Sequence, residues 1–379
     1  MKLFKLINIL IKSKYCFVAP PKKNIVIFDN EGAHRLLNVF NKIKKNEYEI
    51  LNSRGEVINL IVILKLLFKL NINQYNYYLE YIKVTECNYV LTFIDNSIQF
   101  YKLKKKLPNI KFIAFQNGWR DNIFFKIINK TNNLSADYIF CYNSNIKKKY
   151  EKKIKANVIS SGSILNNKFE NKLSKNPNEI FFISQIIDKK NQNFLIDNKY
   201  ISWFDFFYEE HLLFQILIKQ KFFKNKKLVI LSRYRKFNKI EFDFYNKIFN
   251  KYDVDWKFKV ISQLENVYKF CLSKKYFLTI DSTLGYELIS RDKKVFFIAT
   301  RINSKKSSRS FGWPCNFDNK GYFWSNLNLK NRKNLSKNIN NYFYKERNFD
   351  TKFIHKNLMN YDKKNKEISK QLSLIGLSL

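Results

Sequence analysis

Short apolar runs alternate with longer amphipathic segments along this chain, and the alternation restarts once. Short apolar runs are typical of buried strands, and amphipathic segments between them are typical of helices that cover both faces of a parallel sheet. INLIVILKLLFKL at 58–70, for example, has a helical period. The pattern predicts an α/β protein with doubly wound sheets. The first block has apolar runs at 24–29, 48–52, 89–94, 110–116, 137–143 and 157–163.

A polar stretch with Pro177 and no apolar periodicity, NNKFENKLSKNPNE at 166–179, separates the two blocks and reads as a linker. We therefore expect an N-terminal domain at 1–170, a second domain at 178–340, and C-terminal helices with a polar tail at 341–379. Two such domains bind ligands at the carboxyl ends of their strands, in the crevice between them. The second block has apolar runs at 179–185, 227–235, 256–262, 276–282 and 294–300.

The formal charge of +39 first suggests a nucleic-acid partner. The excess is almost all lysine, with 60 Lys and only 10 Arg, and Arg is the residue that forks onto phosphates and base edges. Lys, Asn, Ile and Phe are enriched together along the whole chain, which indicates a compositional bias. We expect no nucleic-acid partner, but a positive surface would favour contact with an anionic membrane.

The five cysteines are scattered without CxxC spacing, and the three histidines lie far apart. This predicts a reduced, cytoplasmic protein without a metal site or cofactor. The N-terminus, MKLFKLINILIKSKYC, is interrupted by lysines and is too short in its apolar runs to span a membrane. We expect a basic amphipathic helix there, which packs on its own domain or docks on a membrane.

Glycine is rare, with eight in the chain, so each is expected to serve a turn or a close approach. DSTLGYE at 281–287 follows an apolar run and begins a helix, which suits a phosphate. Here we predict donor binding by the turn and by Glu287, which could accept hydrogen bonds from a ribose. The alternative is an ordinary capped helix. The donor candidates in this motif are Asp281, Ser282, Thr283, Gly285 and Glu287.

FQNGWRD at 115–121 ends a strand of the first domain, where polar groups face the expected crevice. Either it is an ordinary Asn-Gly turn, or it holds acceptor and catalytic groups. The catalytic candidates are Gln116, Asn117, Arg120 and Asp121, and Gly118 and Trp119 are candidates for acceptor contacts.

Arg233 and Arg235 follow a buried run in ILSRYRKF and would suit a diphosphate, unless the turn is simply solvated. Ser184 ends the first strand of the second domain and is a further donor candidate. Asp29 and Glu31 follow the first strand, and either is a candidate general base, with helix capping as the alternative. The remaining acceptor candidates are Gly162 and Ser163, in a turn before the linker, and Trp313, in the aromatic loop 311–324.

Taken together, the QNGWRD turn, the GS turn, the arginine turn, DSTLGYE and FGWP…G.FW resemble a family of bacterial surface carbohydrate biosynthesis proteins. That family looks like GT-B glycosyltransferases, with more distant similarity to capsule and teichoic-acid transferases. The resemblance covers about residues 20–330 and implies two Rossmann-like domains facing across a cleft. It further implies an activated sugar donor at the C-terminal domain and a glycan or lipid-linked acceptor at the N-terminal one. The high lysine content and the lack of GxGxxG and DxD motifs depart from common patterns.

The sequence thus favours a metal-independent glycosyltransferase of lipopolysaccharide or capsule synthesis. It would move a sugar from a nucleotide-activated donor to a surface glycan or lipid-linked acceptor, in the cytoplasm or peripherally on the inner membrane. A sugar-nucleotide epimerase or a polyol-phosphate transferase of the same fold is the alternative. A basic nucleic-acid-binding protein is the weaker one.

Overall fold

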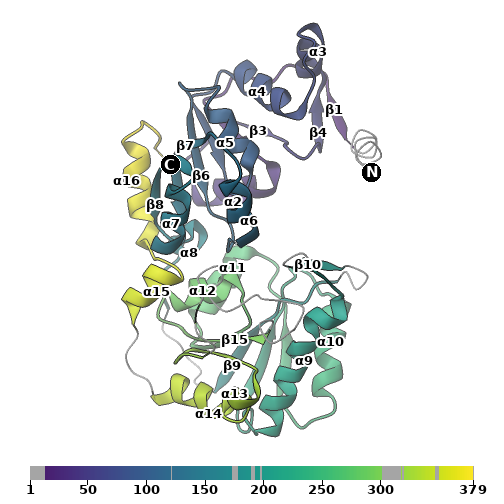
Figure 1. The fold of residues 1–379 in the computed structure, drawn as a ribbon. Helices are drawn as coiled ribbons and strands as arrows, with labels where there is room; N and C mark the ends of the chain where they lie inside the picture. Colours follow the sequence, from purple (N-terminus) through teal and green to yellow (C-terminus); the bar gives the residue numbers. More distant parts are fainter. Residues whose placement is uncertain are drawn as a thin grey trace. The chain divides into compact units, whose positions relative to one another are not determined.

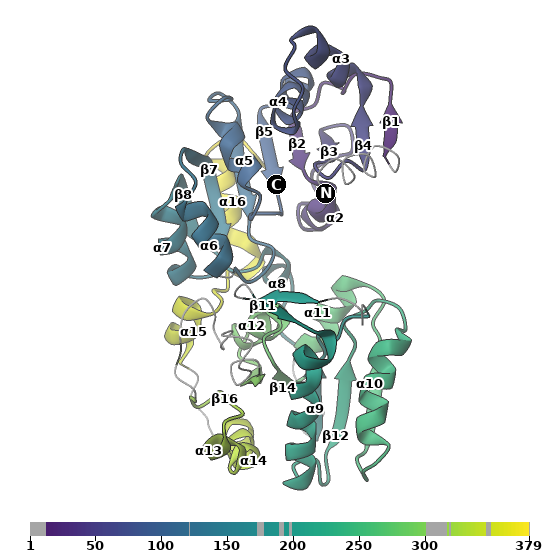
Figure 2. The ribbon, with the colours of Figure 1, turned by 45° about the vertical axis from the view of Figure 1, so that its right-hand side comes forward.

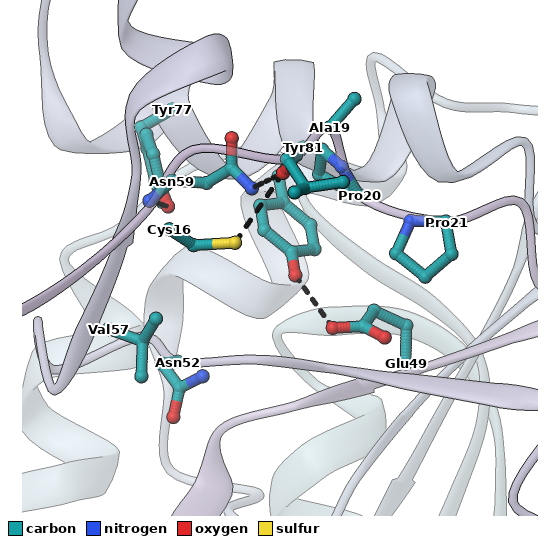
Figure 3. A pocket seen from close by; sticks show the side chains of 11 residues that line it. Cys16, Ala19, Pro20, Pro21, Glu49, Asn52, Val57, Asn59, Tyr77 and Tyr81 are labelled. Carbon is teal, nitrogen blue, oxygen red and sulfur yellow. Dashed lines mark hydrogen bonds between the residues drawn. The ribbon is translucent and has the colours of Figure 1, made fainter.

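The structure is a computed structural model, drawn in Figures 1 and 2. The chain divides into two compact units. Unit 1 contains the chain up to Arg120, Phe124–Lys168 and the C-terminal residues from Asp362, and unit 2 contains Phe169–Tyr361. The residues that the structure describes are 13–120, 122–172, 178–188, 193–196, 199–300, 317, 320–345 and 350–378.

Unit 1 is built on a six-stranded parallel sheet with the strand order β3-β2-β5-β6-β7-β8. The central strands are mainly apolar because helices cover both faces; all four residues of IVIF in β2, for instance, are buried. The strands are β2 (Ile25–Phe28), β3 (Tyr48–Leu51), β5 (Tyr89–Thr92), β6 (Lys111–Phe115), β7 (Leu134–Cys141) and β8 (Ile154–Ser160).

The helices of unit 1 connect these strands, and a small parallel ribbon of two strands lies beyond them. The ribbon pairs β1 (Lys14–Cys16) with β4 (Val57–Asn59), and neither strand is predicted from the sequence. The helices are α2 (Asn30–Val39), α3 (Leu60–Phe68), α4 (Gln74–Thr85), α5 (Ile98–Lys104), α6 (Asn122–Asn129), α7 (Ser144–Glu151) and α8 (Ile164–Lys168). The helix expected at the N-terminus falls outside the described residues.

Unit 2 has a second six-stranded parallel sheet, with the order β13-β12-β9-β14-β15-β16. In chain order this is 3-2-1-4-5-6, which is the strand order of the Rossmann fold. The strands are β9 (Glu179–Ile183), β12 (Lys227–Leu231), β13 (Trp256–Lys259), β14 (Tyr276–Thr279), β15 (Lys294–Ala299) and β16 (Trp324–Asn326).

The aromatic loop 311–324 shows no strand period in the sequence, yet the edge strand β16 begins at its last residue, Trp324. The expectation that no strand lies here is therefore wrong. Strand β16 is only three residues long and pairs with β15 alone among the strands, so it needs no long apolar run. A hairpin of β10 (Phe194–Ile196) and β11 (Lys199–Ile201) is also new. The helices before β16 are α9 (Trp203–Lys219), α10 (Lys239–Phe249), α11 (Leu264–Leu272) and α12 (Thr283–Ile289).

The residues expected as one C-terminal segment divide between the two units. In unit 2 lie α13 (Leu329–Arg332), α14 (Leu335–Asn340), the π-helix η2 (Asn341–Lys345) and α15 (Thr351–Asn357). In unit 1 lie the 3-10 helix η3 (Lys363–Asn365) and α16 (Lys366–Ser373). The chain thus returns to unit 1 instead of ending in a tail. Within the described ranges, no helix is both long enough and apolar enough to cross a bilayer.

Candidate functional site

The strand order of the unit 2 sheet reverses between β9 and β14. In open parallel sheets, ligands bind outside the carboxyl ends of the strands at such a reversal. The turns that follow β9, β12 and β14 begin at Ser184, Ser232 and Ile280, on three adjacent strands. These three turns therefore form the candidate site of unit 2.

Gln185 links the three turns directly. Its backbone carbonyl accepts a hydrogen bond from Arg233 Nη1 at 3.1 Å, and its Oε1 accepts one from the backbone N–H of Asp281 at 3.3 Å. The guanidinium of Arg233 is exposed at this edge. Thus four of the predicted donor-binding positions, Ser184, Arg233, Asp281 and Ser282, lie in turns at one edge of the sheet, as the strand-end pattern predicts.

A buried carboxylate holds the arginine turn from below. Glu241 on α10 accepts hydrogen bonds from Ser232 Oγ at 2.5 Å and from the backbone N–H of Arg233 at 2.9 Å. Burial raises the pKa of Glu241, although these hydrogen bonds act in the opposite direction. Asn238 begins the same helix and accepts a hydrogen bond from the backbone N–H of Glu241 at 3.0 Å. The position of Arg233 is therefore set by a rigid helix and not by the loop alone.

Ser184 faces inward and belongs to the same buried layer. Its Oγ lies 2.9 Å from the hydroxyl of Tyr245, which in turn lies 3.5 Å from Oε2 of the buried Glu210. The side chain of Ser184 is thus engaged by α10, and a ligand would meet its backbone before its hydroxyl. Arg235, the other arginine of the turn, has an exposed side chain.

The DSTLGYE motif begins α12 as the sequence predicts, but two of its residues have packing roles. Ser282 is the N-cap residue, and residues 281–284 are half-exposed. A Cβ atom at Gly285 would lie 2.7 Å from Thr279 Cγ2 and 3.1 Å from Phe297 Cε1. The missing side chain at Gly285 thus lets α12 approach the sheet, and room for a phosphate there stays a prediction.

Glu287 is buried, and its carboxylate points to α11. Both of its oxygens lie 2.9 Å from the hydroxyl of Tyr268, which donates to them. A ribose could reach this carboxylate only if Tyr268 moved. The geometry gives Glu287 a bridging role between α11 and α12, and the ribose contact stays a prediction.

In unit 1 the QNGWRD turn is held by a buried aspartate that the sequence analysis did not single out. Asp95 lies three residues after the end of β5, and its Oδ2 accepts a hydrogen bond from Arg120 Nε at 2.8 Å. Its Oδ1 accepts from Arg120 Nη2 and, at 3.1 Å, from the backbone N–H of Asn117. Tyr150 also donates to Asp95. Burial alone would lower the pKa of Arg120, but the charge of Asp95 and its hydrogen bond raise it, so the Arg120 guanidinium stays charged.

The polar side chains of this turn are used inside unit 1. Gln116 Nε2 donates to the carbonyl of Gly118 at 2.8 Å, and Gln116 Oε1 accepts from the backbone N–H of Tyr142 at 2.8 Å. Gln116 and Arg120 are both buried and hold the turn through these hydrogen bonds, and their catalytic roles stay predictions. Trp119 is half-exposed, and a Cβ atom at Gly118 would meet no other atom within 4 Å. The space over this glycine is open.

The two candidate bases, Asp29 and Glu31, differ in burial and in hydrogen bonding. Asp29 is buried, and its carboxylate accepts from the backbone N–H of Glu31 at 2.9 Å, from Ser53 Oγ at 2.8 Å and from Arg54 Nε at 3.0 Å. A base needs a free lone pair facing the substrate, so this carboxylate is a structural anchor. Glu31 is exposed and forms an ion pair with Arg54. The hydrogen bond and charge of Asp29 raise the pKa of Arg54 against the opposing effect of burial.

The remaining predicted positions fall in or near the GS turn or outside the described chain. Gly162 has a φ of +79°, which explains a glycine there. Ser163 is buried and caps the start of α8 through a 3.5 Å contact with the backbone N–H of Asn166. Asp121 and Trp313 lie outside the described residues.

Some of these partners follow patterns that are visible in the sequence. Asp95 follows the run YVLTFI, so it obeys the same strand-end rule as Asp29 and Gln116. Asn238 and Glu241 have the spacing of a helix N-cap followed by an acidic residue in the first turn. The position of Tyr268 opposite Glu287 comes from helix packing and leaves no local pattern.

The two units are Rossmann-like α/β units, as the sequence predicts, and together they define a GT-B-like protein. Residues 111–373 match the model of a family described as "putative O-antigen biosynthesis protein". Because the match covers well over half of the chain, this protein belongs to that O-antigen biosynthesis family. The resemblance to surface carbohydrate biosynthesis proteins is thereby confirmed. No curated protein has a matching sequence.

Solved structures with the same fold include a UDP-GlcNAc 2-epimerase and a protein whose structure was solved with UDP. The UDP-GlcNAc 2-epimerase from Methanocaldococcus jannaschii has 15% sequence identity and a TM-score of 0.50, with 93% of this chain and 99% of that chain covered. The S. aureus MnaA structure with UDP has 13% identity and a TM-score of 0.50, with 94% and 97% covered. At these identities the similarity establishes the fold and not the activity.

Proposed function

We propose that this protein is a glycosyltransferase of the GT-B type, which transfers a sugar from a nucleotide-activated donor to a surface glycan or lipid-linked acceptor. The observation that carries the proposal is the turn cluster of unit 2, where Gln185 joins the turns of Arg233 and Asp281 at the strand-order reversal. Membership of the O-antigen biosynthesis family supports a sugar substrate.

In this proposal, the donor diphosphate binds at Arg233, with Arg235 as a second cation. A guanidinium can hold two phosphate oxygens at once and can stabilise the charge of the leaving nucleotide, so the transfer would proceed without a metal ion. Activity should then survive chelation of divalent cations. The half-exposed residues Asp281, Ser282 and Thr283 would contact the remainder of the donor. For the S. aureus protein with the same fold, UDP is the nucleotide named.

The acceptor would bind at the carboxyl edge of unit 1. Gly118 leaves open space, and the half-exposed ring of Trp119 offers a face on which a sugar can stack. Asn117 and Arg120 would position this turn through Asp95, and Gln116 would do so through the carbonyl of Gly118. We propose Glu31 as the general base that accepts the proton of the acceptor hydroxyl, at the cytoplasmic face of the inner membrane.

The first test is a thermal-shift panel of UDP-, GDP-, CMP- and dTDP-sugars on the full chain, since a bound donor raises the melting temperature. Arg233→Ala should weaken binding of the active donor by about tenfold to a hundredfold, as expected for the loss of one or two hydrogen bonds to a charged group. Arg233→Lys should lose less, because it keeps the charge but not the fork. Lys236→Ala, an exposed cation in the same turn, is the matched control and should bind like the wild type.

The second test follows the products of the donor that binds. A glycosyltransferase releases the nucleotide together with an extended acceptor, whereas an epimerase yields a new sugar epimer without any acceptor. If Arg233→Ala binds every donor as tightly as the wild type does, the donor site is not at this turn. An epimer formed in the absence of acceptor would replace the proposal with the epimerase alternative.

A further inference from the structure

Unit 1 carries an apolar surface at the C-terminal end of α3. The residues that form it are Leu64, Leu67, Phe68, Leu70 and Ile72, all of them exposed, and we call it the α3 tip. Phe68 is 88% exposed and Leu70 is 95% exposed. The residues of α3 that are buried are Val62 and Leu66. In both ribbon views α3 lies at one end of unit 1 together with β1 and β4 (Figures 1 and 2). Contiguous exposed apolar side chains of this kind mark an interaction surface.

Leu70 also has a backbone conformation that opposes folding. Its φ is +50°, in the left-handed region, at the position after a helix where glycine is preferred. The backbone N–H groups of Leu70 and Asn71 donate to the carbonyls of Leu67 and Leu66, at 2.9 and 3.2 Å, and so close the helix. A leucine is less stable than glycine in this region, because its Cβ atom approaches the following carbonyl oxygen. Nearly all of its side chain faces solvent, so the fold gains no burial in return.

The charge around the α3 tip is positive. No Asp or Glu occurs between Glu56 and Glu80, and the cations of this stretch are Lys65 and Lys69. Lys69 forms an ion pair with Glu80 at 2.7 Å, whereas Lys65 is exposed on α3 itself. An apolar tip with a cation beside it complements an anionic lipid surface, where the apolar side chains enter the acyl region and the lysine meets the headgroups.

A second copy of the chain is a poorer match for this surface. A two-fold interface would bring the same face of both copies together and place Lys65 near its own symmetry mate. Each chain also carries a formal charge of +39, which opposes self-association. In addition, the sequence that precedes β1, MKLFKLINILIK, is apolar and basic, and β1 packs beside α3. The charge of the chain therefore favours the bilayer over a second copy.

We propose that the α3 tip docks the protein on an anionic bilayer, with Phe68 and Leu70 inserted and Lys65 at the headgroups. The proposal does not depend on the transferase activity. It assigns the membrane contact to a described helix of unit 1, outside the residues that match the family model.

Co-sedimentation of the full chain with vesicles tests this proposal. The wild type should sediment with phosphatidylglycerol-containing vesicles and much less with pure phosphatidylcholine. Phe68→Ser and Leu70→Gly should each lower the partition coefficient by about tenfold, the effect of losing one large inserted side chain. Leu70→Gly should also raise the melting temperature, because it relieves the left-handed leucine. Lys65→Glu should weaken binding most at low salt.

Leu329→Ser is the matched control, because Leu329 is 78% exposed on α13 of unit 2. This variant should sediment like the wild type. The proposal is overturned if the wild type ignores anionic vesicles or if the α3 variants bind them normally. It also fails if Phe68→Ser converts a dimer to a monomer in analytical ultracentrifugation, which would make this face an interface between copies. A large fall in melting temperature with unchanged vesicle binding would show that the chain itself covers the tip.

Discussion

Two glycines at strand ends differ in what surrounds them, although the sequence suggests a similar role for both. A side chain at Gly118 would meet open space, whereas one at Gly285 would meet Thr279 and Phe297. Gly118 also has no left-handed φ to maintain. The first glycine is therefore free to serve a ligand, and the second is required by the packing of α12 on the sheet.

Alanine substitutions should separate these two roles. Gly285→Ala should destabilise the protein by about 1–3 kcal/mol, because the new methyl group overpacks a buried contact. Thr279→Ser removes the nearest methyl group and should restore part of the loss in the double variant, while the serine Oγ can still accept from the backbone N–H of Ser282. Thermal unfolding of the single and double variants measures both effects.

Gly118→Ala should change the free energy of unfolding by no more than about 0.5 kcal/mol, as expected for a surface substitution. The melting temperature should therefore stay close to that of the wild type. If an acceptor uses the open space, transfer should nevertheless fall, mainly through a higher KM for the acceptor. Normal kinetics with full stability would remove Gly118 from the acceptor site.

At the scale of elements, the strands were predictable because of how they are buried. IVIF in β2 is apolar throughout and KVFFIA in β15 is apolar after its first residue, since both faces of a parallel sheet are covered. The three-residue strand β16, WSN, lies at the edge of its sheet and carries polar residues, so no apolar run marks it. The hairpin of β10 and β11 likewise has strands of three residues.

The candidate sites were predictable only in their location. The carboxyl ends of parallel strands meet at one edge, so the turns of Arg233 and Asp281 could be grouped from the strand pattern alone. The partners of these turns were not predictable, because they depend on tertiary contacts. Asp95 and Arg120 are 25 residues apart in the chain, and nothing local shows that their charges meet in the interior of unit 1.

The buried carboxylate of Glu241 on α10, which holds the arginine turn, should make the free energy of unfolding depend on pH. Burial raises the pKa of Glu241 above its ordinary value of 4.5, so the folded state binds this proton more tightly than the unfolded state does. Below pH 4.5 the contribution of this group to the free energy of unfolding does not vary with pH, because both states bind the proton. This contribution falls by about 1.4 kcal/mol per pH unit between 4.5 and the raised pKa.

Glu241→Gln cannot titrate, so its stability should fall less than that of the wild type as the pH rises from about 5. The measurement is denaturant unfolding at several pH values, and the slope is compared because the lost acceptor lowers stability at every pH. Glu151→Gln, at an exposed position paired with Lys147, is the control and should keep the wild-type slope. Asp362, whose pKa burial also raises, contributes equally to all three proteins. Identical slopes for Glu241→Gln and the wild type would contradict the assignment.

At the scale of the whole molecule, unit 1 is completed by the last residues of the chain. Asn365 Nδ2 donates to the carbonyl of Ile164 at 3.0 Å, and Asn365 Oδ1 accepts from Asn167 Nδ2 at 2.9 Å. Further along, Tyr89 donates to the carbonyl of Ile375 at 2.8 Å. The apolar side chains that the C-terminal residues bury are Ile368, Leu372 and Leu377. The polar appearance of this segment in the sequence comes from the exposed face of α16 and conceals its structural role.

A chain that ends at Tyr361 should therefore lose stability in unit 1. Each of the three buried side chains contributes about 1.5–3 kcal/mol, so the loss should be several kcal/mol. Limited proteolysis followed by mass spectrometry measures the effect unit by unit, and new cleavage sites should appear between β2 and β8 before they appear in unit 2.

A chain that lacks only Ser378 and Leu379 is the control, because it keeps all three buried side chains and the Tyr89 contact. It should be cleaved like the wild type. Equal protection of unit 1 in the two shortened chains would mean that the C-terminal residues rest on a unit that is already stable without them. Earlier cleavage of unit 2 would mean instead that the return segment stabilises the unit it leaves. Only selective loss of unit 1 fits a domain assembled from both ends of the chain.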